Sequence, residues 1–141
     1  MFMKRFRNQR GAALLETAIT IPIILLISVS IFEFGRAYQT WQVLTNAARE
    51  GARVAVLPAT TNDEVVSTVT SYMTSGRLTA VGTASVSVVR NVPFGSTTAS
   101  RVTINYPFTF IVLNPVAQLV SRGTTTGAPL TMQAAALMRN E

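Results

Sequence analysis

The sequence contains no cysteine and no histidine, and charged residues make up only 13% of it. The chain therefore has no thiolate nucleophile, no imidazole base, no Ser-His-Asp triad and none of the usual zinc ligands. Its six acidic residues offer no evident general acid/base pair. We expect neither enzymatic activity nor a cofactor, and any part outside the cytoplasm must fold without disulfide bonds.

The formal net charge of +6 is concentrated near the N-terminus. Later arginines nearly balance the acidic residues and are scattered singly along the chain, so they form no basic face. We therefore expect no nucleic-acid partner. The N-terminal basic cluster consists of Lys4, Arg5, Arg7 and Arg10.

Residues 12–32 form an apolar run in which Glu16 is the only charged residue. At about 1.5 Å per helical residue, this run is long enough to cross a hydrocarbon core of roughly 30 Å. The basic cluster precedes the run, so the positive-inside rule keeps the N-terminus in the cytoplasm and sends the C-terminus out. The sequence predicts a single-pass anchor in contact with membrane lipid.

A cleavable secretory signal peptide is an alternative, because Ser28-Val29-Ser30 imitates a small-x-small cleavage site. Three features count against it: the run is longer than a typical apolar region, a carboxylate interrupts its start, and the helical pattern continues beyond the site. The anchor is the favoured interpretation.

The helical pattern continues until Pro58, the first strong stop signal. We predict one continuous helix over 12–56, with its first half in lipid, about 12–32, and its second half outside. Pro22 removes one backbone hydrogen bond inside the membrane half, so a kink or local loosening is expected there.

Residues 57–141 are rich in serine and threonine and predict a small extracytoplasmic α+β domain. A helix over 63–74 is capped by Thr61 or Asn62 and ended by Gly76. Alternating apolar residues predict three antiparallel strands. The apolar positions are Val86 and Val88, then Val102, Ile104, Tyr106, Phe108 and Phe110, and finally Leu130, Met132, Ala134, Ala136 and Met138.

Proline and glycine residues mark the turns and the element boundaries within this domain. Pro93-Phe94-Gly95 is the expected turn between the first two strands. Pro107 cannot donate to a sheet, which predicts an edge position or a bulge in the second strand. Asn114-Pro115 predicts the start of a short helix reaching Ser121, and a loop follows over 123–129.

A domain of about 85 residues buries too little apolar area to be comfortably stable alone. The sheet is therefore expected to lie on the outer half of the long helix. Ala47, Gly51 and Ala55 form a stripe of small residues there. Packing within the chain is favoured for this stripe over a surface for a partner.

At the start of the apolar run, a basic flank ends in Gly11, an apolar helix begins at Ala12, and Glu16 stands fifth counting from Ala12. This arrangement resembles the class III signal of type IV prepilins. The resemblance implies that a prepilin peptidase cuts between Gly11 and Ala12 and leaves the helix on the product. Residues 1–11 would then be a cytoplasmic leader.

Glu16 has a physical use in such a product. A carboxylate costs about 2.5–3.5 kcal/mol at the centre of a bilayer helix and less near the interface, where it snorkels to the surface. Cleavage would expose an α-amino group on Ala12 that is mostly protonated at neutral pH. Glu16 of a neighbouring subunit would pair with it and fix the register. A snorkelling glutamate in an ordinary signal anchor is the alternative.

Three further segments carry a second resemblance. They are Glu33-Phe34-Gly35-Arg36, the run from Leu44 to Arg53, and Met138-Arg139-Asn140-Glu141. Together with the start of the apolar run, they resemble the TadE-like family, the minor pilins or pseudopilins of the tight-adherence (Tad/Flp) type IV pilus system. The resemblance is dense over 10–53 and thin afterwards. It implies a structural subunit that helps to start, cap or regulate a pilus used for adhesion and biofilm formation.

The resemblance also implies partners and a location. The partners are the prepilin peptidase, other Tad/Flp pilins and minor pilins, and the inner-membrane assembly platform. The location is the bacterial inner membrane with a periplasmic C-terminal domain, and the outside of the cell once the subunit enters a pilus. Major pilins usually carry an aromatic residue after the glutamate and lack a large C-terminal domain; Thr17 and the domain after residue 56 favour a minor subunit.

Charged residues on the outer half of the helix are candidates for an assembly interface. Glu33 and Arg36 are spaced to form an ion pair on one helix face. Further along the helix, Arg49, Glu50 and Arg53 offer similar ion pairing. Solvated pairs worth under about 1 kcal/mol are the alternative. A second hypothesis for the whole chain is an uncleaved, signal-anchored periplasmic binding module.

Overall fold

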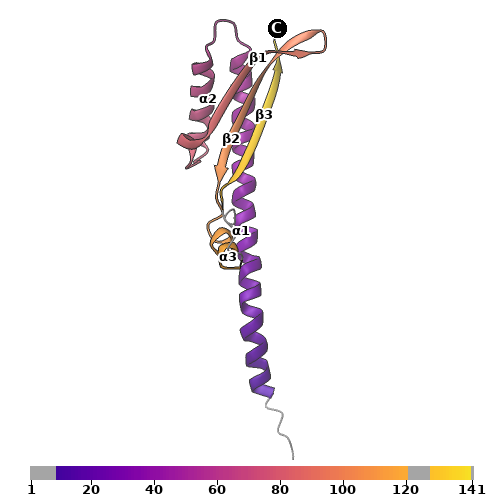
Figure 1. Ribbon diagram of the computed structural model, residues 1–141, viewed down its shortest axis with the longest axis vertical. Helices are drawn as coiled ribbons and strands as arrows, with labels where there is room; N and C mark the ends of the chain where they lie inside the picture. Colours follow the sequence, from indigo (N-terminus) through magenta and orange to yellow (C-terminus); the bar gives the residue numbers. More distant parts are fainter. Residues whose placement is uncertain (1–8, 121–127, 141) are drawn as a thin grey trace, which may run out of the picture.

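A computed structural model describes residues 9–120 and 128–140 and confirms the predicted α+β fold (Figure 1). One long helix runs the length of the molecule, and the other elements gather around its upper half. The elements are α1 (Gln9–Ala55), α2 (Asn62–Ser75), the 3-10 turn η1 (Val81–Thr83), β1 (Ser85–Phe94), β2 (Thr97–Phe108), α3 (Leu113–Val120) and β3 (Leu130–Arg139).

Helix α1 confirms the prediction of one continuous helix. It contains 47 residues and is therefore about 70 Å long at the standard rise. Its lower half stands clear of the other described elements (Figure 1), and residues 11–28 are all exposed. Length and composition make this helix fit a single-pass membrane anchor, and none of its most apolar window is buried within the chain.

Helix α2 begins with the predicted cap. Thr61 accepts a hydrogen bond from the backbone N–H of Glu64, and the Glu64 carboxylate accepts one from the N–H of Thr61. This capping box satisfies two N–H groups that a helix start otherwise leaves unpaired. Gly76 ends the helix as predicted, but its φ of −75° is accessible to any residue. The left-handed conformation belongs to the next residue, Arg77, with φ of 60°.

The sheet has the order β1-β2-β3, and both pairs are antiparallel. The hairpin turn differs from the prediction, because Pro93 and Phe94 are still paired in β1. Gly95 and Ser96 make the turn instead, and Gly95 has the positive φ, 61°, that such a tight turn requires.

Strand β2 is the central strand, so the prediction that Pro107 marks an edge strand or a bulge is wrong for β2 as a whole. At its own position Pro107 pairs with Thr131 of β3. On the other side β1 begins at Ser85, opposite Asn105, and does not reach Pro107. The missing N–H is tolerated because this end of β2 has a neighbour on one side only.

A bulge in β1 directs Arg90 toward the end of α1. The register shifts between Val89 and Val92, and Asn91 within the bulge has φ of 57°. The guanidinium of Arg90 donates to the carbonyls of Ala55 and Thr60, at 2.7 and 2.8 Å, and to the Asn62 side chain. A cation at this position satisfies helix-end carbonyls and complements the helix dipole.

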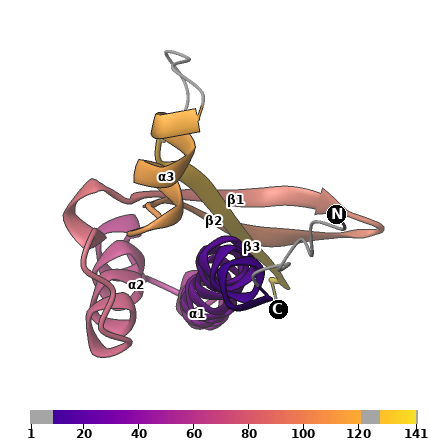
Figure 2. The same cartoon turned by 90° about the horizontal axis from the view of Figure 1, so that it is seen from below.

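The core lies between the outer half of α1, helix α2 and the inner face of the sheet (Figure 2). The stripe of small residues on α1 is buried, as predicted for packing within the chain. A Cβ placed on Gly51 would lie 2.5 Å from Val69 of α2, and one on Gly76 would lie 2.4 Å from Val43 of α1. The two helices therefore approach closely because both positions lack a side chain.

The last two elements lie near their predicted positions. Helix α3 begins at Leu113, one residue before the expected Asn114-Pro115 start. Strand β3 covers the third alternating set and buries Ala134 against the core. Most of the predicted loop over 123–129, the helix end at Ser121, and residues 1–8 of the leader lie outside the described residues.

Replacing Gly51 with alanine should loosen the contact between α1 and α2. Val69 is β-branched and has little rotamer freedom in a helix, so the new methyl group forces the helices apart. We expect a loss of about 1–2 kcal/mol, since overpacking exceeds the gain in helix propensity. Hydrogen exchange of the α2 amides in detergent-solubilised protein measures this loss.

Gly35→Ala is the matched control. A Cβ at Gly35 meets no other atom within 4 Å, so this change should leave α2 unaffected or raise helix stability by up to about 1 kcal/mol. Equal exchange rates in the Gly51 and Gly35 variants would contradict the packing argument.

Candidate functional site

Gly11 and Ala12, which flank the predicted processing bond, lie in the first turns of α1. The helix begins at Gln9, and both residues are exposed. Glycine lowers helix stability by about 1 kcal/mol relative to alanine, so Gly11 weakens the first turns of α1 beside this bond. Cleavage itself stays a prediction. Three residues of the basic cluster, Lys4, Arg5 and Arg7, lie outside the described residues.

Every hydroxyl group in the apolar run is satisfied within α1. Each one donates a hydrogen bond of 2.7–2.8 Å to the carbonyl of the residue four positions earlier. Such bonds lower the cost of carrying a hydroxyl group into lipid, where no water is present to replace them. The donors are Thr17, Thr20, Ser28 and Ser30.

Glu16 differs from these hydroxyl groups. Its side chain is exposed, and within the described part of the chain no hydrogen bond or ion pair reaches its carboxylate. A carboxylate near the lipid needs a partner, which must come from water, a headgroup or another molecule. Glu16 is thus the one polar side chain of residues 12–32 that the described structure leaves without an internal partner.

Pro22 lies inside α1, and the helix is unbroken there. Because proline has no N–H, the carbonyl of Ala18 receives no helical bond from it. The expected kink or loosening in the membrane stays a prediction.

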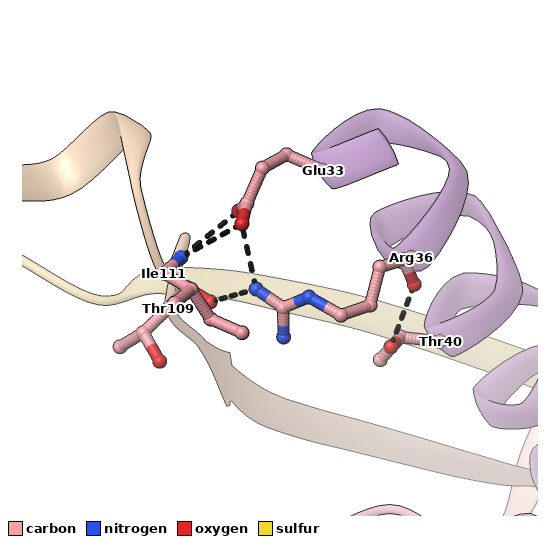
Figure 3. A network of polar contacts seen from close by, with 5 residues as sticks. All are labelled: Glu33, Arg36, Thr40, Thr109 and Ile111. Atoms are coloured by element: carbon pink, nitrogen blue, oxygen red, sulfur yellow. Dashed lines mark hydrogen bonds and ion pairs between the residues drawn. The ribbon is translucent and has the colours of Figure 1, made fainter. Parts of the chain in front are cut away.

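Glu33 is the centre of a polar cluster at the outer end of the apolar run (Figure 3). It is only 6% exposed, and both carboxylate oxygens accept hydrogen bonds from the backbone N–H of Ile111, at 3.1 and 2.9 Å. Nη2 of Arg36 lies 3.2 Å from Oε2 of Glu33 and also donates to the carbonyl of Thr109. We call these four residues the Glu33 clasp. It holds the chain after β2 against α1.

One aromatic ring lies against the guanidinium of Arg36. Its Cζ atom lies 4.5 Å from the ring centroid of Phe108, a cation–π geometry. Phe110 packs edge-on against Phe108 and Phe34, with centroid distances of 5.1 and 5.9 Å. The carbonyl of Arg36 accepts a bond from the Thr40 hydroxyl at 3.0 Å. Arg36 is therefore held by charge, by a ring face and through its backbone.

The predicted pairing of Glu33 with Arg36 is confirmed. Sequence reasoning missed their contacts with Thr109 and Ile111, because residues 33 and 111 are 78 positions apart and helical spacing reveals only near neighbours. Within the chain, these contacts already account for the burial of Glu33. A role for the pair between subunits stays a prediction.

Arg53 and Glu50 also pair, with 3.5 Å between Nη1 and Oε2, but their side chains are 69% and 39% exposed. An exposed pair of this kind contributes under about 1 kcal/mol. Arg49 is exposed on the same helix. The use of these three residues as an interface stays a prediction.

An open groove lies between α1 and α2. It is lined mainly by uncharged polar side chains. Among residues 9–120 and 128–140, no group of three or more acidic side chains is placed to hold a metal ion. The groove therefore offers amides and hydroxyl groups for hydrogen bonding; they include Gln39, Gln42, Asn46, Ser71 and Tyr72.

Comparison with known proteins gives a family match that begins at the predicted processing site. Residues 11–53 match the model of the TadE family, described as TadE-like protein. The match covers Glu16, the Glu33–Arg36 pair and the Arg49–Arg53 segment, and it confirms the resemblance for this part of the chain. No curated protein and no solved structure matches the chain. The TadE-like family is a structural family associated with the Tad pilus.

Replacing Glu33 with alanine should release the chain after β2. The change leaves the N–H of Ile111 without an acceptor and Arg36 without its carboxylate. We expect the local opening free energy to fall by about 2 kcal/mol, which corresponds to roughly 30-fold faster exchange of the Ile111 amide. Residue-resolved hydrogen exchange of the solubilised full chain measures it.

Glu50→Ala is the control, because it removes a carboxylate from an exposed pair on the same helix. It should change exchange at Ile111 by less than about twofold. Unchanged protection of Ile111 in the Glu33 variant would show that the clasp does not hold this segment.

Proposed function

We propose that this chain, whose residues 11–53 belong to the TadE-like family, is a minor pilin or pseudopilin of a Tad/Flp type IV pilus. It acts as a non-enzymatic structural subunit in the assembly of a pilus used for adhesion and biofilm formation. The observation that carries the proposal is the exposed carboxylate of Glu16, which lacks a partner in the described chain while the hydroxyl groups around it are satisfied.

In the stored protein, Glu16 lies one turn of α1 beyond Ala12, about 6 Å along the axis. Its carboxylate reaches the membrane surface by snorkelling, so one subunit alone is tolerated in the bilayer. The N-terminus is cytoplasmic, the helix crosses the inner membrane once, and the domain after residue 56 is periplasmic. This orientation follows from the basic cluster before the apolar run.

Assembly begins with cleavage between Gly11 and Ala12 by a prepilin peptidase. The new α-amino group is cationic at neutral pH and meets Glu16 of a neighbouring pilin displaced along the fibre axis. The ion pair selects one stagger between helices, because every other stagger leaves two charges unpaired in an apolar bundle. The assembly platform and the other pilins of the system are the remaining partners.

Cleavage is tested by mass spectrometry of the protein from its native host. The mature N-terminus should be Ala12, and Gly11→Leu should leave the leader attached, because a bulky side chain then stands directly before the scissile bond. Gly35→Ala, a glycine change elsewhere on α1, should be processed normally. Functional pili that contain the chain with Met1 still in place would overturn this step.

The role of Glu16 is tested by Glu16→Leu and Glu16→Gln. Both should insert into the membrane at least as well as the original chain. Both should reduce the amount recovered in sheared pili by at least about 100-fold, since one charge of a buried pair loses its partner. Thr17→Val is the neighbouring control. It removes a hydroxyl group that bonds only to its own helix, and it should assemble normally.

The open groove between α1 and α2 favours a second candidate function, an uncleaved signal-anchored binding module in the periplasm. The Glu16 variants separate the two candidates. A binding module would tolerate the loss of the charge. If pili assembled at the original rate in the Glu16→Leu variant, the pilin role would therefore be excluded.

A further inference from the structure

Segment 111–120, which contains α3, lies beside the outer end of the apolar run. Both oxygens of Glu33 hold the N–H of Ile111, and Ile111 and Val112 share an apolar hollow with Ser28, Val29 and Phe32 of α1. Figure 1 shows α3 next to α1 below the strands, at the lower edge of the domain. The clasp therefore fixes this segment at the level where α1 leaves the lipid.

Most side chains of this segment are apolar and exposed. Segment 111–120 contains no charged residue. Ile111 is 67% exposed, and Leu119 and Val120, at the end of α3, are 83% and 85% exposed. Asn114 and Gln118 are four positions apart and lie on one helix face, opposite Val116, Leu119 and Val120. The segment is amphipathic, and its apolar face is open at Leu119 and Val120, whereas Val116 is half-buried.

Figure 2 looks along α1 and shows α3 projecting to one side of it. Helix α3 thus extends sideways from the lipid-exposed surface of the anchor, in the region where a bilayer has its headgroups. An amphipathic helix in such a position lies in the plane of the interface and buries its apolar face at the boundary with the acyl chains.

We propose that segment 111–120 is a second membrane contact, which inserts the side chains of Ile111, Leu119 and Val120 into the outer leaflet of the bilayer that α1 crosses. It sets the depth of the domain and fixes its rotation about the α1 axis. The inference uses the anchor role of α1 but not the cleavage or the pairing of Glu16. A second protein on this face is the alternative that the experiment separates.

The full chain, reconstituted into phosphatidylcholine–phosphatidylglycerol vesicles, tests the proposal. The sequence has no cysteine, so each variant carries one thiol for an environment-sensitive fluorophore. Leu119→Cys reports on α3, Ile24→Cys on the middle of the anchor, and Ala135→Cys on the exposed outer face of β3. All three positions are exposed, so labelling should leave the protection of the Ile111 amide unchanged.

A nitroxide near the glycerol end of the lipid acyl chain should quench the Leu119 probe by roughly half, because the helix lies about 5–10 Å into the boundary region. A nitroxide near the methyl end should quench the Ile24 probe instead. The Ala135 probe should respond to neither. Quenching at Leu119 should also persist when the protein is diluted with lipid.

Two results would overturn the proposal. One is an unquenched Leu119 probe in vesicles where the Ile24 probe is quenched. The other is a Leu119 probe that becomes shielded only at high protein-to-lipid ratio, which would identify a second protein as the occupant. An unquenched Ile24 probe would overturn the anchor itself, and with it both membrane contacts.

Discussion

The fold depends on one constraint: the outer half of α1 is the core of the domain that follows it. Leu44, Ala47 and Ala52 are fully buried there, between α2 and the sheet. The domain after residue 56 is too small to bury a core of comparable size without this helix. The same helix continues into the apolar anchor, whose residues 11–28 are all exposed, so the core depends on the outer half of α1 and not on the anchor half.

The two glutamates of the lower and middle parts of α1 illustrate how environment decides the use of a carboxylate. Glu33 is buried, accepts a hydrogen bond that the backbone N–H of Ile111 shares between both carboxylate oxygens, and pairs with Arg36, so its requirements are met within the chain. Glu16 lies about 25 Å lower along the same helix and is exposed without an internal partner in the described structure. The continuous helix between them sets the distance from the clasp to the charge that remains to be paired.

Local patterns in the sequence predicted most of the fold. The length of α1, the cap at Thr61 and the alternation in β2 each follow from residues close together in the chain. Contacts between distant segments were not predicted, because no local pattern links Glu33 to Ile111 or Arg90 to Ala55. The order of strands was also hidden, since alternation reveals a buried face and not a strand's neighbours.

Gly76 shows that a correct prediction can rest on the wrong reason. It was expected to end α2 through its conformational freedom, whereas the structure requires it for the space beside Val43. At the anchor, the length of the apolar run predicted a membrane helix, but only the geometry separates the satisfied hydroxyl groups from Glu16.

The pairing of β3 with β2 has a consequence for biosynthesis. Helix α1 leaves the ribosome first, whereas β3, the last described strand, is made much later and then covers both α1 and the free edge of β2. Contacts between segments so far apart in the chain form slowly. Until translation reaches β3, the membrane-tethered nascent chain presents an open strand edge and an uncovered helix face, and crowded ribosomes would place such edges within reach of one another.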